Sequence, residues 1–105
     1  MYAQRVDGLD MNDLRGLADT LRDKLKSAVI ALGSVKDGKA SLLLAVTKDL
    51  SGRFPAGELI KPLSAAIGGT GGGRPEMAQA GGKLTDEIDR ALAQAFSEVE
   101  RKAKA

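Results

Sequence analysis

The sequence predicts an α/β fold, a mixed β-sheet of about four strands with helices packed on it, in the order β-α-β-β-α-β-α. Two observations support this class. Apolar residues recur at spacings of three and four in residues 11–26 and 88–99, which is the period of an amphipathic helix. Between these segments, continuous apolar runs at 28–32 and 40–46 flank an Asp-Gly pair, which is typical of a tight turn between buried strands.

The first half of the chain predicts a strand, a helix and a pair of strands. Residues 2–6 alternate in polarity and indicate a short edge strand. Asp10 is placed to cap the helix that follows, because its carboxylate can accept hydrogen bonds from the free N–H groups of the first turn. We expect the strands at 28–35 and 40–46 to form the central antiparallel pair, with residues 36–39 as the hairpin turn.

The second half predicts two more helices and one more strand. A helix is expected over residues 55–67, kinked or split by Pro62, which removes a backbone donor. Gly68 stands where a glycine commonly ends a helix in the left-handed conformation. Residues 77–80 predict a short strand of small residues, and Thr85 is expected to cap the last helix.

The composition excludes several classes of function. The 105 residues suffice for one domain with its own core. Because the chain contains neither cysteine nor histidine, it cannot supply a Ser-His or Cys-His nucleophilic pair, or a zinc site built on those residues. No apolar run approaches the roughly 20 residues that cross a bilayer, and no signal peptide is apparent. We therefore expect a non-catalytic, cytoplasmic domain without a membrane partner.

The net charge of +2 is unevenly distributed along the chain. Residues 1–33 have a net charge of 0 and residues 84–105 a net charge of −1. Residues 34–83 have a net charge of +3, from four acidic and seven basic residues, the latter being Lys36, Lys39, Lys48, Arg53, Lys61, Arg74 and Lys83. A local excess of this sign is expected near an anionic partner, although it is small.

Residues 68–83 contain seven glycines among sixteen residues. Such a density is typical either of a flexible linker or of a shaped loop whose amides surround an anion. The amphipathic segment before the glycines and the small apolar run after them favour the shaped loop. If Gly72 in that loop has a positive φ, Gly72→Ala should cost more stability than an average surface change, because a β-carbon is penalised there. A purely structural role, in which the glycines allow close packing, is the alternative.

The same stretch carries a resemblance to a known family. Its pattern, GGxGGGRPxMAQAGG, resembles the signature of the C-terminal, DHH-associated domain of alanyl-tRNA synthetase, which DHH phosphoesterases share in looser form. Three flanking segments are also similar to the synthetase, namely Gly38–Leu42, Thr47–Asp49 and Ala56–Ile60. One departure is Thr70, where the synthetases commonly have lysine. The phosphoesterases usually carry a histidine soon after the glycines, and this chain does not.

The resemblance implies that residues 1–105 are a single DHH-associated domain, excised from a longer synthetase. It implies a tRNA-binding domain that contacts the outer corner of alanine-specific tRNA and supports aminoacylation and editing by other domains. No cofactor is expected within these residues, whereas ATP, Mg²⁺ and Zn²⁺ would belong to the other domains. We expect the isolated domain to be monomeric and the parent enzyme to be a possible homodimer.

Seven residues are candidates for RNA contact, namely Gly71, Gly72, Gly73, Arg74, Lys48, Lys61 and Lys83. For Arg74 an internal ion pair with Glu76 or Glu58 is the favoured alternative. The three aromatic residues are too few to stack unpaired bases, and Phe96 is expected on a buried helical stripe. Any RNA contact should therefore be with folded RNA, through shape and phosphates. Gln79 could contact a base or satisfy a neighbouring loop.

Two other functions remain open at this stage. The first is a substrate module of a DHH-type phosphoesterase that binds nucleotides or short oligonucleotides. The second is a protein-interaction scaffold domain. Titration with a dinucleotide against folded tRNA would separate the first from a tRNA-binding domain, and nuclease-resistant capture of a protein partner would favour the second.

Overall fold

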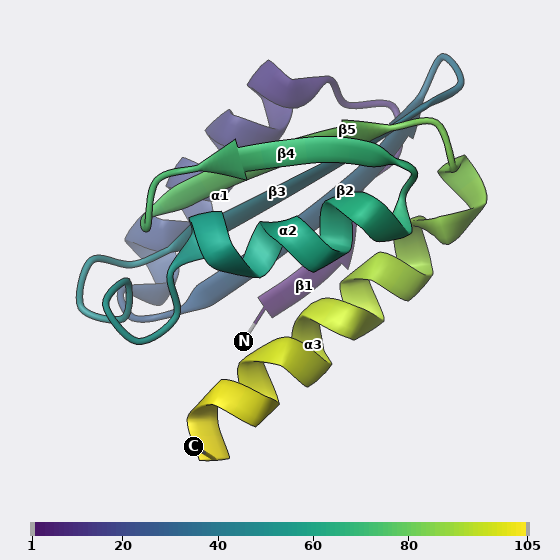
Figure 1. Ribbon diagram of the computed structural model, residues 1–105. Helices are drawn as coiled ribbons and strands as arrows, with labels where there is room; N and C mark the ends of the chain where they lie inside the picture. The colour runs from purple at the N-terminus through teal and green to yellow at the C-terminus, as the bar shows by residue number, and fades with distance from the viewer. Residues whose placement is uncertain (1, 105) are drawn as a thin grey trace.

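The computed structural model describes residues 2–104 and confirms the α/β class, with helices on both faces of one mixed sheet (Figure 1). The sheet has five strands rather than about four, in the spatial order β1-β2-β3-β5-β4. The elements along the chain are β1 (Tyr2–Arg5), α1 (Met11–Leu25), β2 (Val29–Lys36), β3 (Lys39–Val46), α2 (Ala56–Ala66), β4 (Gly69–Gly73), β5 (Met77–Gly82), a 3-10 turn η1 (Thr85–Glu87) and α3 (Ile88–Lys104).

The predicted central pair forms as expected. β2 and β3 are antiparallel and are joined at Asp37 and Gly38, which have φ angles of 52° and 74°. Because six consecutive residues of β2 are buried, this strand packs against helices on both of its faces. Leu42 and Leu44 face α2 and α3, whereas Leu43 faces α1. The alternation divides the core into two clusters, and we call the sheet faces the α2–α3 face and the α1 face.

The beginning of α1 follows the sequence prediction. The Asp10 carboxylate accepts a hydrogen bond from the Asp13 N–H at 2.9 Å, and the Asp10 N–H donates to the Asp13 carboxylate at 3.2 Å. This reciprocal pair is a capping box, which satisfies two amides that the helix itself leaves free. Leu14 and Ala18 are fully buried against the sheet. They hold α1 mainly on β2 and β3.

Two expectations about the other helices are wrong, and of the two alternatives for Pro62 the split is excluded. Pro62 lies inside α2 without splitting it, so one helix spans Ala56–Ala66. Thr85 does not cap α3, because η1 comes first and its N-cap residue is Leu84, without a side-chain hydrogen bond. Phe96 is 47% exposed, whereas Ile88 and other residues of α3 form the buried stripe. Gly68, in contrast, has the expected left-handed φ of 67°.

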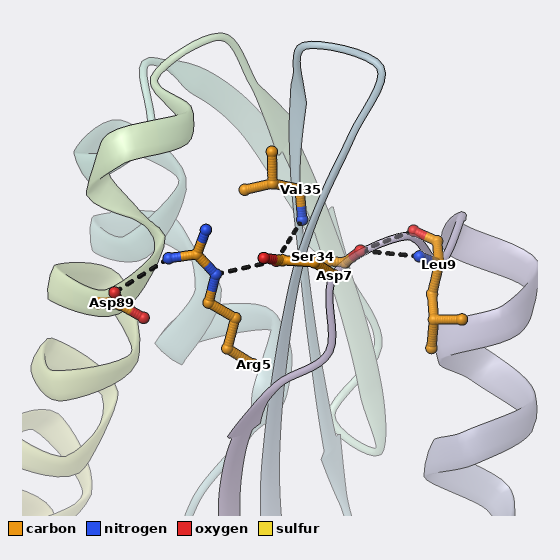
Figure 2. Close-up of polar contacts among 6 residues, drawn as sticks. All are labelled: Arg5, Asp7, Leu9, Ser34, Val35 and Asp89. Atoms are coloured by element: carbon orange, nitrogen blue, oxygen red, sulfur yellow. Dashed lines mark hydrogen bonds and ion pairs between the residues drawn. The ribbon is translucent and has the colours of Figure 1, made fainter.

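Side chains tie the parallel edge strand β1 to its neighbours (Figure 2). Arg5 donates to Asp7 at 2.9 Å and to Asp89 of α3 at 3.0 Å. The buried Ser34 hydroxyl of β2 accepts from the Leu9 N–H at 3.1 Å and donates to the Leu9 carbonyl at 2.8 Å. The sheet, the connection into α1 and helix α3 are therefore linked at this edge.

Candidate nucleic-acid interface

The glycine run forms an edge strand and not the predicted loop. β4 pairs only with β5, in a register that places Gly71 opposite Ala80 and Gly72 opposite Gln79. Glycine has a low intrinsic preference for strands, and the sequence pattern therefore gave no sign of β4. We call residues 69–74, the strand and the arginine that follows it, the glycine edge.

Close approach of β4 to β5 explains three of its four glycines. A β-carbon on Gly71 would lie 2.5 Å from the Ala80 β-carbon, and one on Gly73 would lie 2.5 Å from the Met77 carbonyl oxygen. Gly69 is more obstructed still, because its β-carbon would overlap the Gly81 carbonyl oxygen of β5. A β-carbon on Gly72, in contrast, would meet nothing within 4 Å. The structural explanation that we left open therefore holds for alternate glycines and fails at Gly72.

The conformation of Gly72 does not meet the condition of positive φ on which its predicted substitution cost depended. The positive-φ glycines in the described chain are Gly8, Gly38 and Gly68, and the glycine edge contributes none. The edge is paired with β5 up to Arg74 and Met77, whose N–H groups each donate to the other's carbonyl oxygen, at 2.9 and 3.2 Å. Bonded and outward-facing residues alternate in an antiparallel pair, so the amides of Gly73 and Gly71 face away from β5.

The structure brings most of the predicted site residues to this edge. Gly72, Gly73 and Arg74 line one surface hollow. Gly72 and Gly73 also line a second hollow, together with Lys61 of α2. Lys83 lies at the opposite end of β4, where it shares a hollow with Lys39, Gly69 and Thr70.

Lys48 is separated from the other predicted cations. It follows the end of β3 and lines none of the three hollows. Its neighbour Asp49 is engaged locally, because hydrogen bonds from Ser27 and Thr47 hold the pKa of the Asp49 carboxyl below its usual value. Its position within the resembling segment Thr47–Asp49 and its membership of the basic segment are thus the arguments for Lys48.

In the described part of the chain, the cations of the basic segment form no ion pairs. Within residues 2–104, none of the seven basic side chains between positions 34 and 83 forms an ion pair, whereas Arg5, Arg22, Arg90, Arg101 and Lys102 all do. The favoured internal ion pair of Arg74 is therefore wrong. Glu58, one of its two expected partners, instead lies 3.9 Å from Lys102.

Sequence reasoning missed Arg15 as a member of this surface. Arg15 of α1 lines the same hollow as Arg74 and donates from Nε to the Gln79 side-chain oxygen at 3.0 Å. Gln79 thus has a structural partner, but this partner is a side chain of helix α1 and not the neighbouring loop that we expected. The two residues are 64 positions apart. No local signal in the sequence connects them.

With this geometry established, comparison places the chain in a family. The family described as the DHHA1 domain matches residues 1–101, and the chain belongs to it. The sequence resemblance to the DHH-associated C-terminal domain of alanyl-tRNA synthetase is also confirmed.

Within this family, the chain is similar to alanine–tRNA ligases. The chain is 50% identical to an alanine–tRNA ligase of Solibacter usitatus and 51% identical to one of Dechloromonas aromatica, in each case over 102 residues. These matches cover 97% of this chain but 12% of each ligase. The crystal structure of the C-Ala domain from Aquifex aeolicus alanyl-tRNA synthetase is similar with a TM-score of 0.83 at 32% identity, covering 93% of this chain and 87% of that one.

Proposed function

We propose that this chain is a C-terminal tRNA-binding domain of an alanyl-tRNA synthetase, with the glycine edge and its surrounding cations as the contact surface. Two findings support an alanyl-tRNA synthetase as the parent enzyme. The relatives are alanine–tRNA ligases, and the similar crystal structure is of a C-Ala domain. The chain spans about an eighth of those ligases, so their catalytic activity would reside in other domains.

The observation that carries this proposal is the set of seven basic side chains without an ion pair in the described chain. Elsewhere in the fold several cations are neutralised by nearby carboxylates. Around β4 the positive charge of Lys61, Arg74 and Lys83 is left for a partner outside the domain. A polyanion with regularly spaced phosphates fits this requirement, because each neutralised phosphate also releases counterions.

The chemistry of the surface favours folded RNA over unpaired strands. No aromatic side chain lines the hollows beside β4, and Phe54 is buried. Stacking of single bases therefore lacks a platform there. Guanidinium and ammonium groups beside a smooth glycine strand suit the phosphates and 2′-hydroxyls of a helical tRNA corner.

Several parts of the proposal concern the longer protein. ATP, Mg²⁺ and Zn²⁺ would act in its other domains, and this domain would support aminoacylation and editing by holding the tRNA. The domain itself would be monomeric, in a parent that could be a homodimer, and its location would be cytoplasmic. Among residues 2–104, no helix has the length and apolar character required to cross a membrane.

A gel-shift assay with alanine tRNA and a noncognate tRNA at two salt concentrations tests the function. We expect affinity to fall with salt at about 0.9 log units per log unit of salt for each phosphate bound. Lys61→Glu combined with Lys83→Glu should weaken binding strongly, and Lys48→Glu should weaken it less. Absence of tRNA binding by the unaltered chain, or a double reversal without effect, would refute the proposal.

A dinucleotide provides the competing ligand for the phosphoesterase alternative. If the domain were a nucleotide-binding module, the dinucleotide would compete with tRNA when the two are present at similar total concentrations of phosphate groups. We expect no such competition, since a dinucleotide reaches too few of the separated cations.

A further inference from the structure

The α1 face of the sheet lacks a covering helix over β4. Leu43 of β3, Gln79 of β5 and Gly72 of β4 are successive partners in the sheet and so lie on the same face. Leu43 is buried beneath α1, whereas Gly72 is exposed. Because α1 packs mainly on β2 and β3, the sheet surface is only partly covered over β5, where Met77 packs against the α1 cluster, and is exposed over β4.

A hollow of about 480 Å³ lies on this open surface. We call it the arginine hollow, and its lining residues are Arg15, Gly72, Gly73, Arg74, Met77, Ala78 and Gln79. Arg15 reaches it from α1, and both Nε and one terminal nitrogen of its guanidinium donate to the Gln79 side-chain oxygen. The guanidinium is thus held over β5, and Nη1 also donates to the Asn12 side-chain oxygen at 3.4 Å. Since a guanidinium has five N–H groups, two remain available on this exposed side chain.

Neither arginine of the hollow is neutralised by the protein. Within residues 2–104, Arg15 and Arg74 have no carboxylate within the 4.0 Å of an ion pair. Arg22, two turns further along α1, pairs with Asp19. Two like charges around one hollow repel each other, and an anion placed between them removes that cost. A planar guanidinium also matches the oxygen geometry of a phosphate.

Gly72 supplies a second, independent observation. Its β-carbon would meet no atom within 4 Å and its φ is not positive, so neither packing nor backbone conformation requires a glycine there. A strand glycine without a structural reason is explained where another molecule approaches the backbone closely. Gly72 lies in the wall of the arginine hollow, where any side chain would occupy space beside Arg74.

We propose that the arginine hollow binds one backbone phosphate of folded tRNA, with Arg15 and Arg74 as its ligands and Gln79 as the positioning residue of Arg15. The inference rests on the proposed function and adds to it a specific site on the α1 face. Arg15, which lies far from the glycine run in sequence, is then an RNA contact equal in weight to Arg74.

The test measures tRNA affinity against salt concentration for Arg15→Gln, Arg74→Gln and the double variant. Each single change should weaken binding about five- to tenfold near physiological salt and reduce the salt slope by about 0.9, the loss of one phosphate. Because both arginines hold the same phosphate, the double variant should lose no further slope. A slope loss near 1.8 in the double variant would contradict a shared phosphate.

Arg22→Gln is the matched control, since it removes the same charge from the same helix at an ion-paired position. It should change neither affinity nor slope. If the unaltered chain binds tRNA while Arg15→Gln behaves like Arg22→Gln, the site is refuted and the proposed function stands. If the unaltered chain does not bind tRNA, both fail.

Gln79→Glu tests the role of Arg15 in binding without lowering the stability of the protein. The new carboxylate would pair with Arg15 in the existing geometry, so the thermal unfolding temperature should stay equal or rise. Binding of tRNA should nevertheless weaken to the level of Arg15→Gln, because the guanidinium is neutralised. Unchanged binding in a folded Gln79→Glu protein would contradict the assignment of Arg15.

Discussion

The two edges of the sheet differ in whether their charged side chains are paired within the protein. At the β1 edge, Arg5 pairs with Asp7 and Asp89, and the Ser34 hydroxyl satisfies both backbone groups of Leu9. At the glycine edge, alternate glycines press against β5, and the cations have no carboxylate partner in the described chain. One edge is closed by its own side chains, and the other presents backbone and positive charge.

This difference indicates that one edge of the domain contributes to stability and the other to binding. The charged side chains at the β1 edge form ion pairs that connect the strand, the segment leading into α1 and helix α3. The charges of Lys61, Arg74 and Arg15 contribute no such internal pairs and remain available to a ligand. Changes at the β1 edge should therefore affect folding, and changes of charge at the glycine edge should affect binding.

The largest effect is expected where a methyl group is added between β4 and β5. Gly71→Ala places a β-carbon against Ala80 and the Gln79 carbonyl, at 2.5 and 2.7 Å. Such overpacking should lower the free energy of unfolding by about 2–3 kcal/mol. Urea denaturation followed by circular dichroism measures the change.

Gly72→Ala is the internal control for that substitution, because its methyl group enters open space. It should shift the free energy of unfolding by less than about 0.5 kcal/mol. Equal losses at the two positions would show that the glycines share one role, contrary to this account.

A smaller loss of stability is expected at the opposite edge. Ser34→Ala removes a fully buried hydroxyl and leaves the Leu9 N–H and carbonyl without their partner. The cost of such unsatisfied groups is about 1–3 kcal/mol. The affinity for tRNA, measured well below the unfolding temperature, should be unchanged. A variant with normal stability but weakened tRNA binding would reverse the assignment of the two edges.

Local chemistry explains what the sequence could predict of this fold. The capping role of Asp10, the hairpin at Asp37 and Gly38, and the helical stripe through Leu14 depend on neighbours within a few residues. The glycine strand depends instead on pairing with β5, because glycine alone has little tendency to form a strand. The fifth strand was therefore missed.

Prediction of the candidate site from the sequence was likewise limited to residues that are close together in the chain. Arg74 and the glycines were found because they are contiguous, and Lys61 and Lys83 because they lie in the basic segment. Arg15 and its partner Gln79 meet only through the packing of α1 on the sheet. The expected burial of Phe96 was also wrong, because the buried stripe of α3 runs through Ala91 and Ala95 to Val99 and leaves Phe96 beside it.

The smallest effect is a pH dependence confined to the β1 edge. The hydrogen bond from Arg5, followed by the one from the Val35 N–H, holds the pKa of the Asp7 carboxyl below its ordinary value of 3.8. A lowered pKa in the folded state stabilises the protein at pH values above 3.8, and this contribution is lost as the pH falls through the folded pKa.

Asp7→Asn should therefore lower the unfolding temperature near neutral pH, and the gap should close as the pH falls below about 3.8. Thermal unfolding between pH 2 and pH 7 tests this. A gap that stayed constant over the whole range would mean that the carboxylate charge is not what stabilises the β1 edge.

The central claim is that RNA contacts the glycine edge and not the β1 edge. The most direct measurement is an amide NMR spectrum of the labelled chain, recorded during titration with alanine tRNA. The account predicts that signals of residues 70–74 and of the Arg15 side chain shift or broaden first, while those of residues 2–5 remain in place. Early changes at residues 2–5 with an unaffected glycine edge would contradict it.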